Sequence, residues 1–187
     1  VTLSGSPTLA TTDSLDTFSG DVSGAGALTV TSGTGGLTFG STIGAGVNIT
    51  SLSTSGTTGN ITLGGDIDSD GTLSFNGPVL LAADVTITTS DDLVTFSDTL
   101  DNAQNLVVTT SSGGVTFTGI VGGTTPLTSL LTTATTGTIT LGGNVNTTGA
   151  QNYVGPVSFN SDIALNVTGG TDSDDVSFGS TVTSTSD

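Results

Sequence analysis

Three aspartates alternate with other residues in the stretch DIDSDG, residues 66–71. Alternate carboxylates followed by a glycine bend suit a hard cation such as calcium, which takes oxygen ligands from a tightly folded loop. The twelfth position of such a loop is usually a glutamate, and here it is Gly77. The sequence therefore offers Asp66, Asp68 and Asp70 as a candidate calcium site, with a solvated acidic turn as the alternative.

Two further groups of carboxylates could do chemistry. The stretch TDSDD, residues 171–175, is a second candidate calcium loop. The pairs Asp91-Asp92 and Asp174-Asp175 resemble the paired carboxylates with which glycosidases carry out acid–base catalysis. Such enzymes also use basic groups to bind substrate and tune the acid, and this chain has none. We therefore expect no enzymatic activity, and no cofactor other than calcium.

The composition excludes several classes of function. The chain of 187 residues has a net charge of −16, with no Lys, Arg, His, Cys, Met or Trp, and all sixteen acidic residues are Asp. Nucleic-acid binding requires cations that neutralise phosphates, so we expect none. Thiol or imidazole catalysis lacks its reagents. No apolar run reaches the length of a membrane-spanning helix, and no basic segment followed by an apolar stretch marks a signal peptide at Val1.

The same composition favours a folded all-β protein. Leu, Ile, Val and Phe make up 50 of the 187 residues, which is above the level typical of disordered chains. Most other residues are Thr, Ser, Gly, Asn and Asp, which form strands and turns, whereas strong helix formers are nearly absent.

A repeat of 78 residues is the strongest pattern in the chain. Residues 24–71 and 102–149 align without gaps and share 22 identities in 48 positions. The units are 1–23 (partial), 24–101, 102–183 with a four-residue insertion near 168–173, and 184–187 as the start of the next. Apolar and glycine positions are kept between units, whereas Asp66, Asp68 and Asp70 become Asn or Thr. We interpret this as one continuous repeat protein, residues 1–187.

Within each unit, short phrases such as GGLTFGSTI and GGVTFTGIV place apolar residues in alternation with hydroxyl residues. This pattern predicts short strands that cannot bury an apolar face alone but can do so by stacking. We therefore predict a parallel β-solenoid of eight or nine coils with about 20–25 residues each, forming a rod about 40 Å long. A barrel or a sandwich is the alternative. One step between apolar anchors, from Leu63 to Phe75, is only 12 residues and does not fit this coil length.

Two positions test the alignment. Asp16 occupies a place where later units have Val94 and Val176, so we expect the chain to be frayed or bulged there, with Leu15 taking the core position. Tyr153 replaces Phe75, and we expect it in the core with its hydroxyl at a corner. Four N-x-S/T sequences begin at Asn48, Asn60, Asn146 and Asn166, for which asparagine ladders are the interpretation and glycosylation the alternative.

The phrases GGTTPL (122–127), TTGAQNYVGPV (147–157) and VSFGSTV (176–182) resemble repeats of very large bacterial surface proteins, the filamentous-haemagglutinin-like and "beta strand repeat" adhesins. This resemblance implies a right-handed parallel β-helix that is exported and displayed as an extracellular fibre or stalk at the cell surface, in surface attachment or cell–cell contact. It transfers no catalytic residue. The absence of Lys and Arg is a departure from such proteins.

Neither terminus carries an evident cap for a solenoid. We therefore expect the partners to be adjacent repeats or other copies of the chain, with no membrane insertion of this segment. The alternative to a stalk is a self-assembling subunit of a filament, pilus or sheath, polymerising end to end or by strand exchange.

Overall fold

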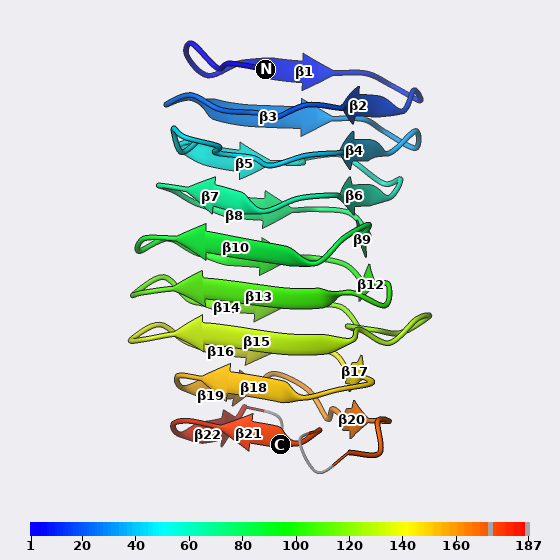
Figure 1. Cartoon of the computed structure of the whole chain (residues 1–187), viewed down its shortest axis with the longest axis vertical. Coiled ribbons are helices and arrows are strands. Elements are labelled where there is room, and N and C mark those ends of the chain that lie inside the picture. Colours follow the sequence, from blue (N-terminus) through cyan, green and yellow to red (C-terminus); the bar gives the residue numbers. More distant parts are fainter. Residues whose placement is uncertain (172–173, 186–187) are drawn as a thin grey trace.

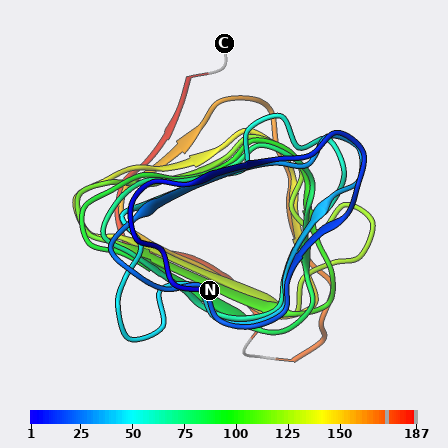
Figure 2. The same ribbon diagram turned by 90° about the horizontal axis from the view of Figure 1, so that it is seen from above.

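The computed structural model describes residues 1–171 and 174–185 and shows a parallel β-solenoid of roughly eight turns (Figure 1). All strand pairs in the described part are parallel, and no helix occurs there. Seen from the N-terminal end, the chain circles clockwise as it recedes, which makes the coil right-handed, and its cross-section is triangular (Figure 2). The predicted all-β, right-handed parallel solenoid is therefore confirmed.

Three faces make up the triangle, and the chain passes through them in the order I, II, III. Face I is the nine-stranded sheet: β1 (Thr8–Ala10), β3 (Ala27–Thr31), β5 (Ser51–Ser53), β8 (Leu73–Phe75), β11 (Val94–Phe96), β14 (Val115–Phe117), β16 (Ile139–Leu141), β19 (Val157–Phe159) and β22 (Val182–Ser184). Face II holds β2 (Asp16–Phe18), β4 (Leu37–Phe39), β6 (Ile61–Leu63), β9 (Val79–Leu81), β12 (Leu100–Asp101), β17 (Val145–Thr147) and β20 (Leu165–Val167). Face III holds β7 (Ile67–Ser69), β10 (Val85–Thr89), β13 (Asn105–Thr110), β15 (Ser129–Ala134), β18 (Gln151–Val154) and β21 (Val176–Phe178).

The core is the interior of this triangle. Most strands have three residues, of which the first and third point inward and are buried while the middle one points outward. Stacked strands place like side chains over one another, so that the rings of Phe75, Phe96 and Phe117 form a continuous stack with centroid distances of 5.0 and 5.1 Å. Each coil therefore excludes water from the interior of the coils next to it.

The 78-residue repeat does not return the chain to the same face. β4 on face II corresponds to β14 on face I, β5 on face I corresponds to β15 on face III, and β7 on face III corresponds to β17 on face II. Starting from Leu37, three full coils bring the chain to Ile61, then Val79, then Leu100, each in register with the one before it on face II. The chain then crosses face III and reaches Val115 on face I. One repeat is thus three and two-thirds coils.

This phase shift explains the 12-residue step. Phe39 and Leu63 lie on face II, whereas Phe75 lies on face I, so the short step spans two sides of the triangle instead of a full coil. The ring stacks follow the repeat and change face with it. Phe18 stacks on Phe39 at 5.1 Å on face II, and their counterparts Phe96 and Phe117 stack at the same distance on face I.

The prediction for Asp16 was wrong. Asp16 is the first residue of β2, in register with Leu37, and Leu15 is 62 % exposed instead of filling the core. The half-buried carboxylate accepts hydrogen bonds from the hydroxyls of Thr11 at 2.8 Å and Ser32 at 2.7 Å. Because these donors replace the water that the carboxylate loses, Asp16 is accommodated in a regular strand without a bulge.

Tyr153 is buried as predicted, but its surroundings differ from those of Phe75. It lies on face III, where its ring stacks on Phe178 at 5.4 Å. Its hydroxyl donates to Oε1 of the buried Gln151 at 3.0 Å inside the core and does not reach a corner. Burial raises the pKa of this phenol above its ordinary range, which favours the neutral hydroxyl that donates to Gln151.

One buried hydroxyl among the described residues lacks a partner. Thr132 is fully buried on β15 between Val108 and Tyr153, and its Oγ1 makes no hydrogen bond. Its counterpart one repeat earlier, Thr54, is also fully buried, but its Oγ1 accepts from the backbone N–H of Asn76 at 2.9 Å. The two threonines are therefore a matched pair that differs in hydrogen bonding.

We predict that Thr132→Val raises the free energy of unfolding by about 1–2 kcal/mol, because it removes an unsatisfied hydroxyl at almost constant volume. Thr54→Val should lower it by about 1–3 kcal/mol, because it leaves the N–H of Asn76 without its partner. Urea denaturation of both variants beside the parent measures the difference. Destabilisation by Thr132→Val would show that its hydroxyl has a partner in solution.

Candidate functional site

The three aspartates of the candidate calcium loop point to different neighbours. Asp66 precedes β7, and its Oδ1 accepts from the N–H of Thr86 on the following coil at 2.8 Å. Asp70 follows β7, and its Oδ1 accepts from Nδ2 of Asn48 on the preceding coil at 2.8 Å. Asp68 is the outward residue of β7. Within the described residues, no three carboxylates gather into a group that could hold a metal ion.

The second repeat explains why these charges vary freely. Asn144 takes the place of Asp66, and its Oδ1 accepts from the N–H of Ala164 at 2.8 Å, which is the same bond one repeat later. An amide oxygen serves as acceptor as well as a carboxylate does. The position therefore requires an acceptor between coils and not a charge.

The other predicted carboxylate sites are also parts of corners. Asp91 accepts from the hydroxyl of Ser112 at 3.1 Å, and the backbone carbonyl of Asp92 accepts from the hydroxyl of Thr89 at 2.8 Å. In the candidate loop 171–175, Asp172 and Ser173 lie outside the described residues. The hydroxyl and the backbone N–H of Thr171 donate to Asp174, and these bonds lower the pKa of the Asp174 carboxyl.

A ladder of polar side chains runs along the corner between faces II and III. The Asp84 carboxylate accepts from the backbone N–H and the Nδ2 of Asn105 at 2.8 and 2.9 Å. Oδ1 of Asn105 in turn accepts from the hydroxyl of Ser129 on the next coil at 2.6 Å. The two bonds from Asn105 hold the pKa of Asp84 below its ordinary value of 3.8.

Two five-residue loops project from the rod, one in each repeat. Residues 44–48 leave face III between Ile43 and Ile49, and residues 122–126 leave face II between Val121 and Leu127. In each case the neighbouring coil spans the same distance with a single residue, Asp68 or Asn146. The loops are equivalent in sequence but project from different sides of the triangle (Figure 2). Sequence reasoning missed them, although GAGVN and GGTTP have the composition of turns.

Asp101 anchors the second loop. Its side chain is 8 % exposed, and its Oδ1 accepts from the backbone N–H groups of Thr124 and Thr125 at 2.8 and 3.2 Å. The next residue, Asn102, adopts a φ of +100° and donates from Nδ2 to the carbonyl of Leu81 at 3.0 Å. No sequence signal set Asp101 apart from the other aspartates that occur near turns.

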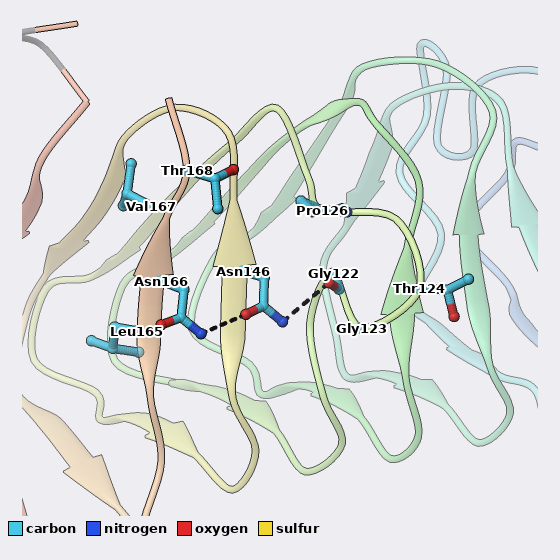
Figure 3. Close-up of a pocket in the computed structure, with 9 residues that line it drawn as sticks. All are labelled: Gly122, Gly123, Thr124, Pro126, Asn146, Leu165, Asn166, Val167 and Thr168. Atoms are coloured by element: carbon cyan, nitrogen blue, oxygen red, sulfur yellow. Dashed lines mark hydrogen bonds between the residues drawn. The ribbon is translucent and has the colours of Figure 1, made fainter. Parts of the chain in front are cut away.

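An open groove of about 630 Å³ lies between this loop and β20 (Figure 3). Its floor is an asparagine ladder: Asn166 donates from Nδ2 to Oδ1 of Asn146 at 2.7 Å, and Asn146 donates to the carbonyl of Gly122 at 3.1 Å. The predicted asparagine ladder is confirmed for this pair. The residues that line the groove include no Asp and no Tyr, so the groove has no titratable side chain, and its hydroxyls are those of Thr124 and Thr168.

Comparisons with known proteins give no relative. No protein-family model, no curated protein and no solved structure matches the chain. The described residues also contain no helix of sufficient length and hydropathy to cross a membrane. The function must therefore be argued from the geometry alone.

The Asp84 ladder gives a site-specific prediction for pH. A carboxyl with a lowered folded-state pKa stabilises the fold above its unfolded pKa, and this contribution is lost as pH falls through the folded value. We predict that an NMR titration of the Asp84 carboxyl gives a pKa below 3.8, and that Asn105→Ala shifts it upward. Asp174, whose carboxyl accepts hydrogen bonds from Thr171 and has a lowered pKa for that reason, serves as a control carboxyl whose pKa Asn105→Ala leaves unchanged. If the pKa of Asp84 were the same in Asn105→Ala as in the parent chain, the ladder would be contradicted.

Proposed function

We propose that this chain is a structural repeat segment of an extracellular fibre or cell-surface adhesin, acting as a rigid stalk or spacer in surface attachment or cell–cell contact. The observation that carries the proposal is the continuity of the stack. Strands repeat along one axis through both sequence units, and side chains at corners bond from coil to coil. Asp66, Asp70 and Asp91, which belong to the sites predicted from the sequence, take part in this bonding.

The surface chemistry supports a passive and exposed role. With a net charge of −16 and a pI near 4.1, copies of the rod repel one another near neutral pH, which discourages lateral aggregation. The absence of Lys and Arg leaves no cleavage site for trypsin-like proteases. It also argues against nucleic acids as partners. On this proposal the chain has no enzymatic activity, and its partners are adjacent repeats or other copies of itself.

A filament subunit that assembles end to end is the second candidate. In the described part of the chain, β1 pairs only with β3, and β22 pairs only with β19. Leu9 is 38 % exposed near one end, and Val182 is 43 % exposed at the other. Edges of this kind can accept a further strand from a neighbouring chain.

Two measurements on the native source separate these functions. An antibody raised against this segment should label intact cells, and the fully denatured antigen should migrate far above 18.1 kDa if the segment belongs to a long stalk. A band close to 18 kDa, from filaments that need strong acid to dissociate, would favour the subunit. Labelling that appears only after the cells are permeabilised would refute an extracellular role.

A further inference from the structure

The outward surface of face I carries one hydroxyl residue on every strand. These residues form a single row across the nine-stranded sheet: Thr8, Thr29, Ser53, Ser74, Thr95, Thr116, Thr140, Ser158 and Thr183. Each is in register with the next, so the row follows the rod axis. Because neighbouring parallel strands are about 4.8 Å apart, nine strands give a row about 38 Å long. Figure 2 shows the traces of most of these strands superposed along one side of the triangle.

The row belongs to the face and not to the sequence repeat. Because each repeat shifts by one face, every residue of the row has its repeat counterpart on face II or III wherever the chain extends that far. Those ten counterparts are Thr17, Thr38, Thr62, Leu80, Asp101, Thr86, Val107, Leu131, Asn152 and Ser177, of which only five carry a hydroxyl. On face I all nine do. Leu80 and Asp101 lie on face II, and their repeat counterparts on face I are Ser158 and Thr183. A hydroxyl residue therefore occurs at these repeat positions where they lie on face I and not where they lie on face II.

The hydroxyls of the central row are not used by the protein. From Thr29 to Ser158, none of the seven side chains donates or accepts a hydrogen bond among the described residues. This contrasts with the corners, where polar side chains such as Asp84 and Asn105 bond to one another. The face is also uncharged, since no strand of face I contains an aspartate, whereas β2, β7 and β12 on the other faces each do. An uncharged, unpaired array on a chain of charge −16 requires an explanation.

The size and chemistry of the array narrow the choice of ligand. A strip three residues wide and 38 Å long presents about 400 Å², about half of what each partner buries in a stable protein interface. The row contains no aromatic or arginine side chain, the residues that anchor protein interfaces. Single hydroxyl contacts are weak, so only a rigid ligand with the same spacing can use all nine at once.

We propose that face I binds ice. The strand spacing of about 4.8 Å is close to the repeat of oxygen atoms along a lattice row of ice, so the hydroxyls can hold water molecules in positions that join the crystal surface. The threonine methyl groups between them limit competing, disordered hydration. The rigid parallel stack fixes the array before contact, so little conformational entropy is lost on binding. This activity is independent of the stalk function.

The test uses the whole chain and two matched double variants. Thr95→Tyr with Thr116→Tyr places two bulky rings at the centre of the row. Thr88→Tyr with Thr109→Tyr does the same at neighbouring outward positions of face III. Circular dichroism and melting temperature check that both variants fold. The readouts are thermal hysteresis, inhibition of ice recrystallisation, and partition into a slowly growing ice hemisphere.

The parent chain and the face III variant should show thermal hysteresis and enter the ice, and the face I variant should lose both properties while keeping its melting temperature. Absence of hysteresis and of ice partition in the folded parent would overturn the proposal. Equal loss in the two variants would also overturn it, because the effect would then not belong to face I. Binding of the parent to crystalline cellulose or chitin without any effect on ice would assign the array to a polysaccharide instead.

Discussion

The interior of the coil must exclude water, and no single coil of 18 to 25 residues can achieve this alone. Each coil supplies only a few inward side chains, so its upper and lower surfaces must be covered by the neighbouring coils. This constraint selects parallel, in-register pairing, because like residues then lie over one another. The stack of Phe75, Phe96 and Phe117 shows the result, with rings about one strand spacing apart.

The same constraint explains how the repeat can change face. Stacking requires an inward apolar residue over another one, but it does not require that the two come from the same place in the repeat. Phe18 and Phe39 therefore stack on face II, and their counterparts Phe96 and Phe117 stack on face I. Corners need only an acceptor between coils, which Asp66 and Asn144 provide equally. A surface feature of one face, such as the hydroxyl row of face I, is therefore built from different positions of the repeat.

Much of the fold could be predicted because strand periodicity is local. The alternation in phrases such as GGVTFTGIV determines which side chains point inward, and burial of Val115 and Phe117 agrees with it. The phase of the repeat could not be predicted, because coil length depends on loops such as 122–126 whose geometry is not local. Asp16 was misjudged because its partners, Thr11 and Ser32, are brought together only by the turn of the coil. The carboxylates of Asp66 and Asp70 looked like one loop in the sequence, but they bond to opposite neighbours.

Distances between spin labels test the phase of the repeat most directly, and the chain has no native cysteine to interfere. Thr38→Cys with Thr116→Cys joins positions 78 residues apart on faces II and I, with an axial separation of about 18 Å. Ser53→Cys with Thr140→Cys joins positions four coils apart on face I, about 19 Å along the axis. A rotation of the repeat by one face predicts a clearly longer distance for the first pair, despite its shorter axial separation. Equal distances for the two pairs would contradict it.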